Sequence, residues 1–75
     1  MNKINVTIFY NDSFPKKYVL SNEEAVDLIK LIKEDVSEFE IKENTYKTED
    51  LSSISFSDVD YEGQVQGVAI QFNEQ

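Results

Sequence analysis

The chain contains no cysteine and no histidine, the two residue types on which most side-chain chemistry depends. Without them a typical zinc centre, a Ser-His-Asp triad, a Cys-His nucleophile pair and a histidine proton shuttle cannot be built. No disulfide can hold the fold, which fits an intracellular origin. Arginine is also absent, so no guanidinium can clamp a phosphate with two parallel hydrogen bonds. We therefore expect no cofactor, no metal and no enzymatic activity.

Glycine and proline are scarce, with two glycines, Gly63 and Gly67, and one proline, Pro15. The two glycines do not make a phosphate-cradling loop, and no Walker or dinucleotide-binding pattern is present. No apolar run approaches membrane-spanning length, and the N-terminus lacks the charge and apolar order of a signal peptide. We expect a soluble, cytoplasmic protein that folds as a single domain over residues 1–75, without linkers or repeats.

Acidic residues are the strongest global feature of the chain. It has 15 Asp and Glu against seven Lys in 75 residues, a net charge of −8. Residues 1–33 hold five Lys and four acids, whereas residues 34–75 hold two Lys and eleven acids. Such a field repels phosphate backbones and anionic lipids and attracts basic protein surfaces. It predicts a basic protein partner, without direct binding of nucleic acid or membrane. The alternative is that the charge only keeps the protein soluble.

One stretch shows where a helix begins and which face it buries. Ser21 followed three residues later by Glu24 is a capping box, and we predict a helix over residues 21–36. The apolar residues of this stretch recur at helical spacing and form one stripe, made of Ala25, Leu28, Ile29, Ile32 and Val36. The sequence therefore predicts an amphipathic helix packed on a sheet.

Alternating apolar residues predict strands on both sides of the helix. Residues 4–10 and 17–20 form one hairpin, and residues 53–57 and 65–72 form another around the turn at 62–64. Residues 38–42 are a further strand or a continuation of the helix, followed by a turn at 43–45. Residues 46–51 are an irregular connection with at most one helical turn, capped by Thr48. The predicted fold is a small α+β domain in the order β-β-α-β-β, an antiparallel sheet of four or five strands with the helix on one face.

The opposite face of this sheet would carry small and mildly polar residues, namely Thr7, Ser53, Ser55, Ser57, Ala69 and Gln71. Such a face can remain in water, or it can dock a second copy or another protein. Phe14 lies in the first turn, where an exposed aromatic residue is unexpected. It either folds back over the sheet edge or anchors a partner.

Residues 58–63 resemble the first half of an EF-hand calcium loop, with acids at the first, third and fifth positions and glycine at the sixth. The resemblance then ends, because Ala69 stands where the loop requires a bidentate glutamate. The flanking segments also alternate like strands, whereas an EF-hand has helices there. We therefore interpret these acids as solvent-facing strand residues and expect no calcium site.

The acids of the second half are our candidate partner-binding residues, and we expect them to form a ridge from the helix end across a loop to a hairpin. The residues predicted to bind the partner are Glu38, Glu40, Glu49, Asp50, Asp58, Asp60, Tyr61 and Glu62. Glu34, Asp35 and Glu43 extend the ridge, and Tyr46 is a second candidate aromatic anchor, since interfaces favour aromatic residues within a polar surround.

In size, charge and composition the chain resembles the small acidic proteins that phages and other mobile elements encode against host nucleic-acid-processing proteins. These include anti-CRISPR and DNA-mimic inhibitors, and the likeness assigns no individual residues. It implies an inhibitor or modulator in a bacterial cytoplasm that occupies a basic surface of a nucleic-acid-handling protein. The alternative is a small accessory or structural module that self-associates through its sheet, for example as a homodimer.

Overall fold

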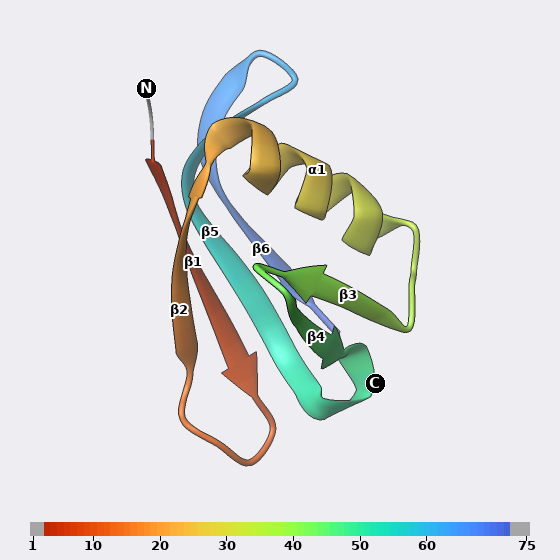
Figure 1. Cartoon of the computed structure of the whole chain (residues 1–75). Coiled ribbons are helices and arrows are strands. Elements are labelled where there is room, and N and C mark those ends of the chain that lie inside the picture. The colour runs from red at the N-terminus through yellow and green to blue at the C-terminus, as the bar shows by residue number, and fades with distance from the viewer. Residues whose placement is uncertain (1–2, 73–75) are drawn as a thin grey trace.

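A four-stranded antiparallel sheet forms the frame of the protein (Figure 1). The structure is a computed structural model and describes residues 3–72. The sheet consists of β1 (Lys3–Tyr10), β2 (Lys16–Ser21), β5 (Leu51–Tyr61) and β6 (Gln64–Gln71), in the spatial order β2-β1-β5-β6. One face is covered by the helix α1 (Asn22–Lys33) and by a small second sheet of β3 (Glu38–Ile41) and β4 (Asn44–Lys47). The predicted α+β class, with one helix on a four-stranded antiparallel sheet, is confirmed.

The order of elements is longer than the predicted β-β-α-β-β. Residues 38–41 are a strand, as one of the two alternatives held, but this strand pairs with β4 and not with the main sheet. The turn is therefore at Lys42 and Glu43, and the stretch expected to be irregular begins with a strand. A 3-10 turn, η1 (Thr48–Asp50), follows β4. Thr48 does not cap it, because its hydroxyl donates to the carbonyl of Ser37 at 3.2 Å.

The helix begins where the capping box predicts. The Ser21 hydroxyl accepts from the Glu24 amide at 3.1 Å, and the Glu24 carboxylate accepts from the Ser21 amide at 3.0 Å. The helix ends at Lys33, three residues earlier than expected, because Asp35 adopts a left-handed conformation with φ of 61°. Val36 consequently leaves the buried stripe and is only half-buried.

The core lies between the sheet and the layer formed by α1 and the β3–β4 hairpin. The buried residues of α1 are Ala25, Leu28, Ile29 and Ile32, as the stripe predicts. Alternate residues of β1 and β5 face them, and Phe39, Ile41 and Tyr46 close the core from the hairpin side. A bulge in β5 between Phe56 and Val59 shifts the alternation by one residue, which returns Val59 to the buried face.

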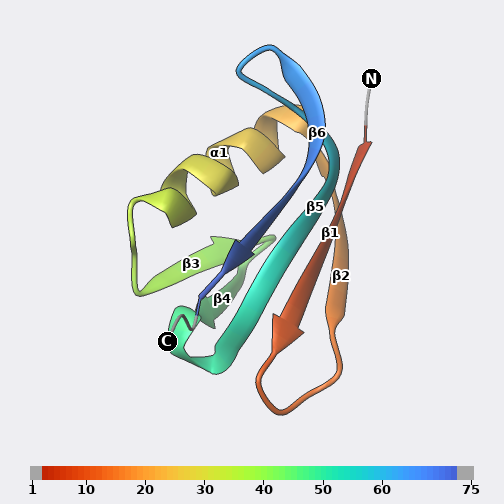
Figure 2. The same cartoon turned by 180° about the vertical axis from the view of Figure 1, so that it is seen from behind.

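The other face of the sheet is left open by these elements (Figure 2). Thr7, Ser53, Ser55 and Ser57 are half-buried among their neighbours, and Ala69 and Gln71 are exposed, as predicted for this face. Phe14 is 90% exposed in the turn between β1 and β2. The expectation that it folds back over the sheet edge is therefore wrong.

Candidate partner-binding surface

The structure distributes the predicted acidic residues over three places. Asp58, Asp60 and Glu62 lie at the end of the β5–β6 hairpin, whereas Glu49 and Asp50 lie in η1 at the opposite end of β5 (Figure 1). Glu38 and Glu40 are exposed on β3, beneath the helix. The expected single ridge from the helix end to the hairpin is therefore interrupted. The reason is that β5 carries the chain across the whole length of the sheet between these groups.

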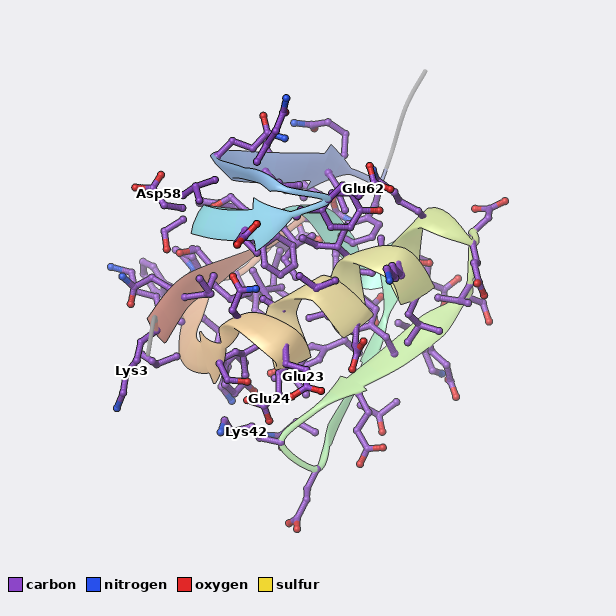
Figure 3. All side chains as sticks on the ribbon, turned by 90° about the horizontal axis from the view of Figure 1, so that it is seen from above. Lys3, Glu23, Glu24, Lys42, Asp58 and Glu62 are labelled. Carbon is purple, nitrogen blue, oxygen red and sulfur yellow. The ribbon has the colours of Figure 1, made fainter. Side chains whose placement is uncertain are left out.

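The end of the β5–β6 hairpin lies along the helix and contacts both its first and its last residue. The Asn22 side chain accepts from the Asp60 amide at 2.8 Å and donates to the Asp60 carbonyl at 3.1 Å. Figure 3 accordingly shows Asp58 and Glu62 on the hairpin beyond the helix, well separated from Lys42. Tyr61 is half-buried, and the Lys33 ammonium lies 4.9 Å from the centre of its ring. This cation–π contact fixes the ring beside α1.

Tyr46, the second candidate anchor, belongs to the core and not to the surface. Only 7% of it is exposed, and its ring contacts those of Tyr10, Tyr18 and Phe39. Its hydroxyl is hydrogen-bonded to that of Tyr18, which also accepts from the Asn44 side chain at 3.2 Å. Burial, followed by the hydrogen bond to Tyr18, raises the pKa of Tyr46 above its ordinary value. Tyr46 therefore holds the β3–β4 hairpin against β1 and β2.

Within residues 3–72, no three or more Asp or Glu side chains converge in a way that could hold a metal ion. The acids that resemble half of a calcium loop are instead part of a strand and a tight turn. Glu62 and Gly63 form this turn with φ values of 53° and 84°. In the same described part of the chain, α1 is the one α-helix, and it is too short to cross a membrane.

A groove between α1 and the β3–β4 hairpin brings carboxylates and apolar side chains together. Its volume is about 560 Å³, and it opens to solvent. The apolar lining consists of Leu20, Leu28, Leu31 and Ile41, and the polar rim consists of Glu24, Asp27, Glu40, Lys42 and Glu43. We call this the α1–β3 groove. Leu31 is 40% exposed, whereas the other apolar lining residues are buried, so Leu31 provides most of the apolar surface open to a ligand.

The charge around the α1–β3 groove is predominantly negative. Four carboxylates surround it, and Lys42 in the β3–β4 turn is the single cation of its lining. The hydrogen bond from the Ser21 amide, with a smaller contribution from the charge of Lys42, lowers the pKa of Glu24. Figure 3 shows Glu24 and Lys42 on the same side of the molecule. At neutral pH the rim therefore presents an excess of negative charge next to an apolar side chain.

The sequence indicated two of the groove residues, Glu40 and Glu43, but not the contribution of the helix. Glu24 and Asp27 lie within residues 1–33, where five Lys stand against four acids, whereas the acidic surplus lies after residue 33. A signal was nevertheless present, because Glu24, Asp27 and Leu31 recur at helical spacing beside the buried stripe. What the sequence did not indicate is that β3 would return along this side of the helix.

The side chains that line the groove are of the kinds that can bind a cationic group together with its aliphatic stem. Carboxylates can accept hydrogen bonds from ammonium and guanidinium groups, and the apolar lining can bury a methyl or methylene group beside them. The pKa of one groove carboxylate is lowered, which keeps Glu24 ionised instead of preparing it as a general acid. In comparisons with known proteins, no family model, no curated protein and no solved structure matches the chain.

Proposed function

We propose that this protein is a small binding module that inhibits or modulates a nucleic-acid-handling protein by occupying a basic surface of that protein. The single observation that carries the proposal is the α1–β3 groove, in which an apolar lining is surrounded by carboxylates. A segment that presents an apolar side chain or an aliphatic stem flanked by lysine or arginine is complementary to it. Such segments are common where proteins contact phosphate backbones.

The net charge supports the same kind of partner. A chain with a net charge of −8 attracts basic proteins over several ångströms and repels nucleic acid. Basic surfaces that bind nucleic acid are therefore the surfaces that it approaches fastest. Exposed ion pairs contribute only about 0–1 kcal/mol each, so the rim carboxylates act together on encounter rate and discrimination. Burial of Leu31 against the partner would add the apolar part of the affinity.

The first experiment is affinity capture from a bacterial lysate with the whole chain as bait. The proposal predicts a basic, nucleic-acid-handling protein whose binding weakens steeply as salt rises, because surface charges are screened over about 10 Å at 0.1 M ionic strength. Capture of no basic protein, or binding that is indifferent to salt, would contradict the proposal.

The α1–β3 groove is then tested with two variants that remove the same number of charges. The groove variant carries Asp27→Asn, Glu40→Gln and Glu43→Gln. The control variant carries Asp58→Asn, Asp60→Asn and Glu62→Gln at the end of the β5–β6 hairpin. All six side chains are exposed, so both variants should fold. We expect the groove variant to lose more than tenfold in affinity, mainly through slower association, and the control to lose less than threefold.

Leu31→Ala separates the apolar contribution from the charge. It should weaken binding without changing the salt dependence, because no charge is removed. If the control and the groove variant weaken binding equally, the partner senses net charge and not the groove. If the control alone weakens binding, the partner contacts the hairpin end carrying Asp58, Asp60 and Glu62.

A further inference from the structure

The two edges of the four-stranded sheet are protected unequally. The edge strand β2 begins with Lys16 and Lys17 directly after Pro15, and such residues discourage pairing with another chain. The other edge strand, β6, has the sequence QVQGVAIQ and contains neither a charged residue nor a proline. In a chain in which 29% of residues are charged, β6 is an unusually neutral strand. β6 therefore lacks the charged residues and prolines that commonly keep a sheet edge from pairing with another chain.

The backbone of β6 is oriented for pairing on its free side. The amide of Phe72, the residue after β6, donates to the carbonyl of Ser52 in β5 at 3.0 Å. Because hydrogen-bonded and non-hydrogen-bonded pairs alternate in an antiparallel ladder, the amides and carbonyls of Ala69 and Gln71 point away from β5. The register between β5 and β6 is regular from Ser53 to Phe56. This part of the edge is therefore suited to accept another strand.

The core is also incomplete on the β6 side. Ile54 and Phe56 of β5 are buried, whereas their β6 partners Ile70 and Val68 are only half-buried. Phe72 is half-buried as well, and it stacks on Phe39 with ring centres 6.1 Å apart. Burial thus decreases toward the free edge. If another strand paired with the free edge of β6, that strand and the layer packed on it would remove this apolar surface from water.

We propose that β6 pairs antiparallel with β6 of a second copy, so that the two sheets join into one continuous sheet around a two-fold axis. Charge identifies a second copy as the occupant. Two β6 strands can meet without placing like charges opposite each other, whereas two β2 strands would oppose their lysines. A basic partner would find no carboxylate on β6 itself. Symmetric pairing of one patch with itself is also the commonest form of assembly.

This dimer and the binding of a basic partner respond to salt in opposite directions. Each copy carries a net charge of −8, so the parts of the two copies outside the uncharged β6 repel each other. Added salt screens that repulsion and strengthens the dimer, while it weakens attraction to a basic partner. The lining of the α1–β3 groove contains no residue of β6 and includes Leu20 of β2, the opposite edge strand, so each surface can be tested independently.

The test is sedimentation equilibrium of the whole chain from micromolar to millimolar concentration, at low and moderate salt. Ala69→Lys adds a charge to β6 at an exposed position, and the matched control is Val19→Lys on β2, where the side chain is 49% exposed. We expect a dimer that strengthens with salt. Ala69→Lys should raise its dissociation constant at least tenfold, and Val19→Lys should change it less than threefold.

Amide hydrogen exchange of the wild-type chain provides a second readout that needs no variant. In the dimer the amides of Ala69 and Gln71 should exchange at least tenfold more slowly at high than at low protein concentration. A monomer at millimolar concentration would overturn the proposal. Equal weakening by the two lysine variants, or concentration-independent exchange at both amides, would do so too.

Discussion

Replacement of Phe39 by alanine tests whether the β3–β4 hairpin is part of the cooperative fold. An isolated two-stranded hairpin is marginal in water, so this one depends on side chains packed against the main sheet. Phe39 is 3% exposed and contacts the rings of both Tyr46 and Phe72. Through these contacts it joins β4 and the segment after β6 to the same cluster.

The expected cost of Phe39→Ala is large compared with the stability of the domain. Truncation of a buried phenylalanine to alanine costs about 3–5 kcal/mol. A domain of 75 residues is stable by roughly 4–11 kcal/mol, from about 0.05–0.15 kcal/mol per residue. If the stability lies at the lower end of this range, the variant should be close to its unfolding midpoint without denaturant; at the upper end it should remain folded with clearly reduced stability. If the free energy of unfolding falls by about 1 kcal/mol per M of urea, the urea concentration at the unfolding midpoint should fall by roughly 3 M or more.

Urea unfolding followed by circular dichroism measures this shift, and Phe14→Ala is the matched control. The control makes the same chemical change at a side chain that is 90% exposed, and it should alter stability by less than about 0.5 kcal/mol. Equal midpoints for Phe39→Ala and the wild type would show that the hairpin does not pack as described. Because the hairpin forms one wall of the α1–β3 groove, the variant should also lose partner binding.

Two further predictions concern the capping box and the buried tyrosine. Ser21→Ala should destabilise the domain by about 1 kcal/mol, which for a chain of this size lowers the melting temperature by about 4–8 °C; an unchanged melting temperature would contradict the observed cap. The pKa of Tyr46 is raised by burial, so its hydroxyl contributes stability that is fully present below the ordinary tyrosine pKa of about 10 and is lost as pH rises above it. The Tyr46→Phe variant should therefore lose less stability than the wild type between about pH 10 and 12. Urea unfolding at each pH measures this difference. Equal losses in the two proteins would show that another group dominates alkaline unfolding.

The prediction of the helix and of the strand faces succeeded because these features depend on neighbours in the sequence. The cap needs only Ser21 and Glu24, which are three residues apart and complete their hydrogen bonds within one turn. The end of the helix was predicted less well, because Asp35 adopts its left-handed conformation without being glycine or asparagine. The apolar stripe alone gave no sign of this stop.

The β3–β4 hairpin was only half predicted for a similar reason. Its turn consists of Lys42 and Glu43, both with positive φ, at 48° and 73°. Two-residue turns of this kind usually carry Asn-Gly or Asp-Gly, and the sequence has neither there. Glu62 and Gly63 have the same backbone form, and the glycine made that hairpin recognisable. Tyr46 was consequently assigned to a loop instead of a buried strand.

The candidate site was decided almost wholly by the tertiary structure. The sequence by itself determined the charge, the absent chemistry, the helix start and the residues of each sheet face, since composition and local periodicity contain this information. It could not determine which carboxylates lie together, because an exposed acid has no local partner that indicates its neighbours. Glu40 meets Asp27 and Leu31 only because β3 returns along α1, and Asp58 is separated from them only because β5 spans the sheet. The path of the chain after each turn, which is set by packing in the core, therefore decides which carboxylates lie close together.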